Sequence, residues 1–141
     1  MNRFGVKFAP YVYAIMRIVV GLMFAVHGSQ KLFGVPGNMP RVPLASLMGL
    51  AGGIELVCGL LIGVGFFAGY AAFLASGQMA FAYFMVHCPH NFDSLVQFFP
   101  IVNKGEPAVI YCFVFLYIAA QGSGVWSVDE CLGMAKKKPS P

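Results

Sequence analysis

LASLMGLAGGIELVCGLLIGVGF, residues 44–66, is an apolar, glycine-rich stretch of 23 residues with a single charged side chain, Glu55. A helix of this length can span the hydrocarbon core of a bilayer, which needs about 20 apolar residues. Three further apolar segments cover about residues 10–33, 67–88 and 106–121. The pattern predicts an all-α integral membrane protein built as a four-helix transmembrane bundle.

The composition of the 141-residue chain excludes an ordinary soluble domain. Apolar residues make up 59% of the chain and charged residues 10%, against about 45–50% and about 25% in soluble domains. So few charges cannot cover a surface that faces water, and the expected partner of the apolar surface is therefore the lipid bilayer. The length predicts a single domain over residues 1–141, and nothing in the composition indicates nucleic-acid binding.

Lysine and arginine predict how the bundle is oriented. The tails carry Arg3, Lys7, Lys136, Lys137 and Lys138, and the opposite loops carry Lys31, Arg41 and Lys104. Basic residues are enriched in cytoplasmic loops, so we expect both termini in the cytoplasm. Residues 130–141 form a basic tail that is expected to be solvated or to contact lipid headgroups.

Small residues indicate which helix faces pack. Gly21 and Gly28 share one face of the first segment. One stripe of the second segment contains Ala45, Gly49, Gly52, Gly59 and Gly63. Membrane helices approach closely where side chains are small, so we interpret these glycines as packing residues.

Two ionisable residues, Arg17 and Glu55, fall inside the apolar segments. A charge at the centre of a membrane helix costs roughly 2.5–3.5 kcal/mol on insertion scales. Their similar depths predict an intramembrane ion pair between Arg17 and Glu55. Such a pair is either a purely structural element or part of a polar cavity that serves a ligand or a proton path.

A second polar group is expected near the outer boundary of the bundle. His27, Lys31, His87 and Glu106 all fall at the ends of apolar segments, at one depth. These residues either anchor the helix ends at the interface or form a site. Histidine titrates near neutral pH, so His87, Glu106 and Lys31 are candidate catalytic residues for proton transfer at an oxygen-bearing headgroup.

The stretch HCPH, residues 87–90, resembles a set of metal or redox ligands. Pro89 bars a continuing helix, so His87 and His90 need not point the same way. A metal site needs more ligands in an agreed geometry, and no metal is expected. Cys88 is a candidate reactive thiol, but the four cysteines follow no haem, zinc or iron–sulfur spacing.

Several motifs in this order resemble the DoxX family of small bacterial membrane proteins. They are the R-x-x-x-G-x-x-F-x-x-x-G-x-x-K pattern from Arg17 to Lys31, GGIELVCGLLIGVG at 52–65, AYFMVHCP at 82–89 and FFPIVNKGEPAVIYCFVFLYIAAQGSGVWSVD at 98–129. The resemblance implies a four-helix, multi-pass protein of the bacterial inner membrane. Its recurring polar positions match Arg17, Lys31, Glu55, His87, Asn103, Glu106 and Asp129. The family usually reads NGGE where this chain reads NKGE, with Lys104 in the turn.

The resemblance implies a redox or quinone setting. The first hypothesis is a quinone- or thiol-linked redox subunit whose ligand contacts His27, Lys31, His87, Asn103 and Glu106. No cofactor motif is present, so a partner subunit or a thiol would have to supply the electrons. The second hypothesis is a non-catalytic accessory subunit that braces a larger membrane redox complex. A transporter is the third, and the absence of a repeat or of a broken helix disfavours it.

Overall fold

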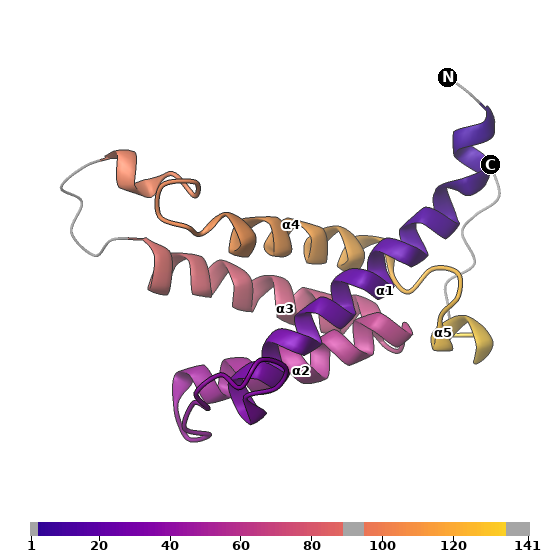
Figure 1. The fold of residues 1–141 in the computed structure, drawn as a ribbon. Helices are drawn as coiled ribbons and strands as arrows, with labels where there is room; N and C mark the ends of the chain where they lie inside the picture. The colour runs from indigo at the N-terminus through magenta and orange to yellow at the C-terminus, as the bar shows by residue number, and fades with distance from the viewer. Residues whose placement is uncertain (1–2, 89–94, 135–141) are drawn as a thin grey trace.

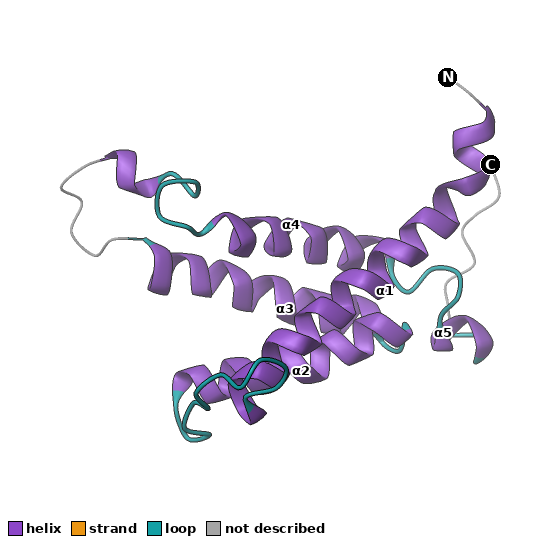
Figure 2. Ribbon diagram, viewed as in Figure 1, coloured by secondary structure: helices purple, strands orange, loops and turns teal. Residues whose placement is uncertain are grey.

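The computed structural model describes residues 3–88 and 95–134, and every regular element in these two ranges is helical (Figure 2). Four long helices make up most of the structure: α1 (Arg3–Phe33), α2 (Leu47–Val64), α3 (Ala68–Ala82) and α4 (Glu106–Gln121). Three short elements complete it: η1 (Tyr83–His87), η2 (Leu95–Phe98) and α5 (Val128–Cys131). The prediction of an all-α fold is confirmed for these residues.

The helix boundaries differ in part from those expected. α1 begins at Arg3 rather than Pro10, so the proline lies inside the helix. A proline removes one backbone N–H from the helical ladder, and apolar helix continues on both sides of it. The expected stop at Pro89, the loop residue His90 and the lysines of residues 136–138 lie outside the described residues.

The second helix is shorter than the apolar run that predicted it, because both of its ends are capped. The Ser46 hydroxyl accepts a hydrogen bond from the Gly49 N–H, and α2 begins at Leu47. Gly65 ends the helix in the left-handed conformation, with a φ of 73°, as glycine commonly does after the last helical turn. The turn after Gly65 leads directly into α3.

In the part of the chain that the structure describes, two helices, over Val6–Phe33 and Leu47–Val64, are long and apolar enough to cross a membrane. α4 is a shorter apolar helix. η1 prolongs α3 to residue 87 through a wider turn, in which the Cys88 N–H donates to the Tyr83 carbonyl at 2.9 Å. Length and composition therefore support a helical membrane protein.

The helices associate in two closely packed pairs (Figure 1). α1 crosses α2, and α3 lies alongside α4. α2 and α3 join the pairs, and a buried core of Phe24, Ile62, Phe115 and Ile118 fills the space between them. The Ser76 hydroxyl on α3 also donates to the Cys112 carbonyl on α4 at 2.8 Å.

Glycines on both helices create the close contact between α1 and α2. A Cβ added at Gly21 would lie 2.6 Å from the Gly63 nitrogen, and one at Gly28 would lie 2.4 Å from the Leu56 nitrogen. A Cβ at Gly59 would lie 2.4 Å from the Ala25 nitrogen. Backbone thus meets backbone along this crossing, as the glycine stripes predicted.

This contact predicts different outcomes for glycines on α2. We expect Gly59→Ala to lower the free energy of unfolding by about 1–3 kcal/mol or more, as in other overpacked sites. Gly53→Ala is the matched control, because nothing lies within 4 Å of a Cβ at that position. Thermal unfolding in mild detergent measures both. Equal melting temperatures for the two variants would contradict the close contact.

Candidate functional site

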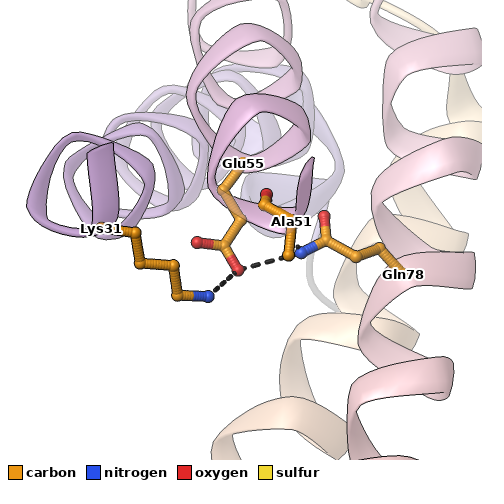
Figure 3. A network of polar contacts seen from close by, with 4 residues as sticks. All are labelled: Lys31, Ala51, Glu55 and Gln78. Atoms are coloured by element: carbon orange, nitrogen blue, oxygen red, sulfur yellow. Dashed lines mark hydrogen bonds and ion pairs between the residues drawn. The ribbon is translucent and has the colours of Figure 1, made fainter. Parts of the chain in front are cut away.

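A buried carboxylate, Glu55, is the centre of a polar network between three helices (Figure 3). The Lys31 ammonium at the end of α1 lies 2.5 Å from Glu55 Oε1. The Gln78 amide of α3 donates to the same oxygen at 2.9 Å, and also to the Ala51 carbonyl at 3.3 Å. Glu55 is only 2% exposed, so its charge is held by protein groups from both neighbouring helices.

The predicted Arg17–Glu55 ion pair is wrong. The Arg17 guanidinium donates to the Ile62 carbonyl at 2.6 Å and to the Gly63 carbonyl at 2.9 Å. It also donates to the Trp126 carbonyl at 2.8 Å. Among the described residues the Glu55 carboxylate pairs with Lys31 instead.

The register of α1 against α2 explains the different pairing. The helices run antiparallel, and the glycine contacts place Gly21 beside Gly59 and Gly63, and Gly28 beside Gly52. Arg17, one turn before Gly21, therefore reaches the end of α2, whereas Lys31 reaches Glu55. The ion pair was predicted by counting how deep each residue lies in its own apolar segment. Such a count does not show how the two helices are shifted along each other, so it cannot predict this register.

Backbone carbonyls, and not a carboxylate, accept the hydrogen bonds of Arg17. The carbonyls at a helix C-terminus lack partners within the helix and carry partial negative charge. Arg17 satisfies two of them on α2 and ties in the segment after α4 through Trp126. That segment is held further by Asp129, which accepts hydrogen bonds from the Phe67 N–H and the Ser123 hydroxyl.

A cavity of about 570 Å³ opens beside the Glu55 network. Its polar and ionisable lining residues are His27, Lys31, Glu55, Gln78, His87 and Tyr111. Apolar side chains of all four long helices, such as Phe24, Ile54, Phe81 and Ala108, make up most of the remaining wall. The cavity is thus an apolar space with polar groups on its walls, which is typical of small-molecule sites.

Three of the five predicted ligand-binding residues line this cavity: His27, Lys31 and His87. His87 lies at the end of η1, where its Nδ1 is 3.2 Å from the Asn103 carbonyl. The aromatic ring of His27 meets that of Tyr111 edge-on, with centroids 6.2 Å apart.

Asn103 and Glu106 do not line the cavity. The Asn103 side chain organises its own loop, since its amide donates to Tyr83 and Gln97 and its oxygen accepts from the Gly105 N–H. Glu106 is exposed at the start of α4 and lines a separate apolar cleft of about 330 Å³. His87 and Glu106, which were expected to carry protons together, therefore line two different cavities.

Two residues of the site, Gln78 and Tyr111, were not expected from the sequence. Gln78 is the one side-chain amide of α3, and an amide in a mostly apolar helix is the signal that could have found it. Tyr111 stacks on Phe115 with ring centroids 5.5 Å apart and faces the cavity beside Phe24. No sequence pattern distinguishes Tyr111 from the other aromatic residues of the core.

Three buried polar atoms beside the cavity lack a hydrogen-bond partner: Glu55 Oε2, Gln78 Oε1 and the Tyr111 hydroxyl. An unsatisfied buried polar group costs about 1–3 kcal/mol, and such groups in native structures point to a function or to a bound molecule. The polar side chains that remain accessible at the cavity wall, Lys31, His27 and His87, can hydrogen bond to a ligand. No cluster of three His, Cys, Asp or Glu side chains suited to a metal ion occurs within 3–88 and 95–134.

The family comparison covers most of this site. The DoxX family model matches residues 12–88. The chain is a member of the DoxX family. With its two long apolar helices it is a DoxX-family membrane protein. The matched region includes Lys31, Glu55, Gln78 and His87 and ends before Tyr111.

A bacterial relative covers 88% of the chain. An uncharacterized protein of Haemophilus influenzae is 39% identical over 127 residues, which is 88% of this chain and 92% of that protein. No solved structure matches the chain. The printed name of this relative gives no activity.

The network predicts which charged pairs are energetically coupled. In a double-mutant cycle we expect Lys31→Met and Glu55→Gln to show a coupling of about 1–2 kcal/mol, as contacting residues do. Arg17→Met and Glu55→Gln share no partner, so their effects should add to within about 0.5 kcal/mol. Chemical unfolding in detergent measures both cycles. A coupling between Arg17 and Glu55 that exceeds the Lys31 coupling would contradict the network.

Proposed function

We propose that this DoxX protein is a quinone-binding subunit of a membrane redox system, with the headgroup seated in the cavity beside Glu55. The observation that carries the proposal is an apolar cavity of about 570 Å³ whose wall includes a few polar side chains, among them Lys31, Gln78 and His87. A quinone has an apolar ring and two oxygens, so it needs an apolar slot with a few hydrogen-bonding groups. Aromatic side chains such as Phe24 and Tyr111 supply flat surface for the ring.

The second cleft fits a hydrocarbon tail. It has a volume of about 330 Å³, and apolar residues of α1 and α4, among them Val20, Met23, Ile110 and Val114, line most of it. Pro107 and Tyr111 line both this cleft and the main cavity. A ligand with its headgroup beside Glu55 could therefore extend its tail past Tyr111 toward the lipid.

The quinone version is favoured over a thiol version by the positions of the cysteines. None of Cys58, Cys88, Cys112 and Cys131 is among the lining residues of the cavity. Because the sequence carries no cofactor motif, the proposed role of this subunit is to bind the quinone, while a partner subunit exchanges the electrons. The proposed setting is a multi-pass protein of the bacterial inner membrane with four spans.

Filling the cavity tests the proposed binding. Gly77 lines the cavity and has nothing within 4 Å of an added Cβ, so we expect Gly77→Phe to fold and to weaken binding of a short-chain benzoquinone at least tenfold. Gly53→Phe is the matched control, since Gly53 has the same open surroundings and does not line the cavity. Equilibrium dialysis on purified protein measures the affinities. Failure of the unmodified protein to bind benzoquinone or naphthoquinone headgroups would refute the proposal.

Reporter fusions test the proposed topology. We expect a fluorescent protein fused after residue 141 to be fluorescent and an alkaline phosphatase fused there to be inactive, because both tails are proposed to be cytoplasmic. A phosphatase fused after residue 39, which follows α1, should be active. Phosphatase activity at the C-terminus would contradict four spans with cytoplasmic ends.

A further inference from the structure

The wall of the cavity carries one pair of opposite charges. Among the described residues that line the cavity, Lys31 and Glu55 are the only ones with a charged side chain besides the two histidines. The Lys31 ammonium and Glu55 Oε1 lie 2.5 Å apart. Whichever of the two groups holds the proton between them, the pair has no net charge. The wall as a whole is therefore neutral when its histidines are neutral.

Lys31 is the member of this pair that a ligand meets. Its side chain is 28% exposed and lines the cavity, whereas the side chain of Glu55 is 2% exposed. An ammonium has three N–H donors and no acceptor. Among the described residues, Lys31 Nζ uses one of these donors, on Glu55 Oε1. Two N–H donors of Lys31 therefore remain for an oxygen atom of a ligand.

The neighbouring polar groups leave Lys31 as the charged donor of the wall. The two hydrogens of Gln78 Nε2 are used by two acceptors, Glu55 Oε1 and a backbone carbonyl. His87 Nδ1 lies 3.2 Å from the Asn103 carbonyl, and since a carbonyl only accepts, Nδ1 carries the hydrogen of the neutral ring. A ligand acceptor is thus recognised mainly through Lys31.

An anion and a neutral carbonyl differ in what they cost at this wall. A charge moved from water into an apolar cavity is costly unless an opposite charge compensates it. The charge of Lys31 is already compensated by Glu55, so an anionic headgroup would leave the cavity with a net negative charge. A neutral carbonyl oxygen accepts a hydrogen bond from the same ammonium and adds no charge.

We propose that Glu55 makes the cavity selective for neutral, acceptor-bearing headgroups over anionic headgroups such as carboxylates and phosphates. The proposal rests on the proposed quinone site and adds its selectivity. Lys31 donates to a carbonyl oxygen of the ligand. Glu55 is a positioning residue, which holds the ammonium in place and cancels its charge. A fatty acid or an anionic phospholipid headgroup therefore competes poorly with a quinone for this site.

Two probes of similar shape and different charge test this selectivity. 2-Methoxy-1,4-naphthoquinone is neutral, whereas 2-hydroxy-1,4-naphthoquinone is an anion at pH 8 because its hydroxyl is acidic. Both are dialysed at this pH, where an ordinary imidazole is neutral, against the purified full-length protein. A dialysis cell with detergent alone corrects for uptake by micelles. We expect the neutral probe to bind at least tenfold more tightly, since the wall does not compensate the anion.

The Glu55→Gln variant tests the assignment to Glu55. Lys31 and Gln78 both donate to Oε1, and the amide oxygen of the variant can take that place with little change in shape. The charge of Lys31 is then uncompensated and favours an anion. We expect the preference for the neutral probe to fall at least tenfold, through tighter binding of the anionic probe.

A double variant, Lys31→Met with Glu55→Gln, separates the donor from its charge. It removes the ammonium and keeps the wall neutral, so the preference for the neutral probe should return. We expect this probe to bind about tenfold more weakly than to the unmodified protein, because a hydrogen bond from a charged donor is lost. An unchanged affinity for the neutral probe would overturn the role of Lys31 as its donor.

Glu130→Gln is the matched control, because Glu130 is exposed on α5, lies outside the cavity and loses the same charge. The ratio of the two affinities should not change in this variant. Equal binding of both probes by the unmodified protein overturns the selectivity and leaves the proposed quinone site standing. An unchanged ratio in Glu55→Gln overturns the assignment to Glu55, and no binding of either probe overturns the proposed function itself.

Discussion

The contact between α1 and α2 determines which charged groups in this protein can meet. Gly21, Gly28 and Gly59 let the two backbones approach until no side chain fits between them, and such a contact permits only one register. In that register Arg17 lies at the C-terminal end of α2 and Lys31 lies beside Glu55. The position of the polar network, and of the cavity next to it, follows from this packing.

Arg17 and Glu55 are the most deeply buried charged side chains of the described residues, and they differ in the groups that surround them. Arg17 donates to three carbonyls, which hold together α1, α2 and the segment after α4. Glu55 has both of its partners on one oxygen, and the other oxygen has none. A buried charge is costly unless it is paired and hydrogen bonded, and each of these side chains keeps one buried atom without a partner, Arg17 Nε and Glu55 Oε2. Arg17 is held by backbone carbonyls, whereas Glu55 is held by Lys31 and Gln78.

Much of the architecture could be predicted from the sequence, because it depends on composition and periodicity. Apolar length predicted helices, and the spacing of glycines predicted the packed face of α2. The ion pairing could not be predicted, because depth counted along one segment carries no information on how two helices slide past each other. Lys31 was predicted as a member of the outer polar group, and in the structure it is the partner of Glu55.

The site was predicted in part for similar reasons. His87 was singled out by its position at the end of an apolar segment, yet its orientation depends on the wider turn of η1, which no periodicity indicated. Gln78 carries no charge and Tyr111 resembles a core aromatic, so their unpaired atoms became visible only in three dimensions. Glu106 shares the end of the bundle with His87, but its side chain belongs to a different cleft.

The most direct test is an experimental structure of the protein in a lipid nanodisc with a short-chain quinone present. We expect a flat ring in the cavity beside Phe24 and Tyr111, next to the Glu55 network. We also expect Lys31, and not Arg17, to lie against the Glu55 carboxylate. A cavity occupied only by lipid acyl chains, with no ring beside Glu55, would contradict the proposed quinone site.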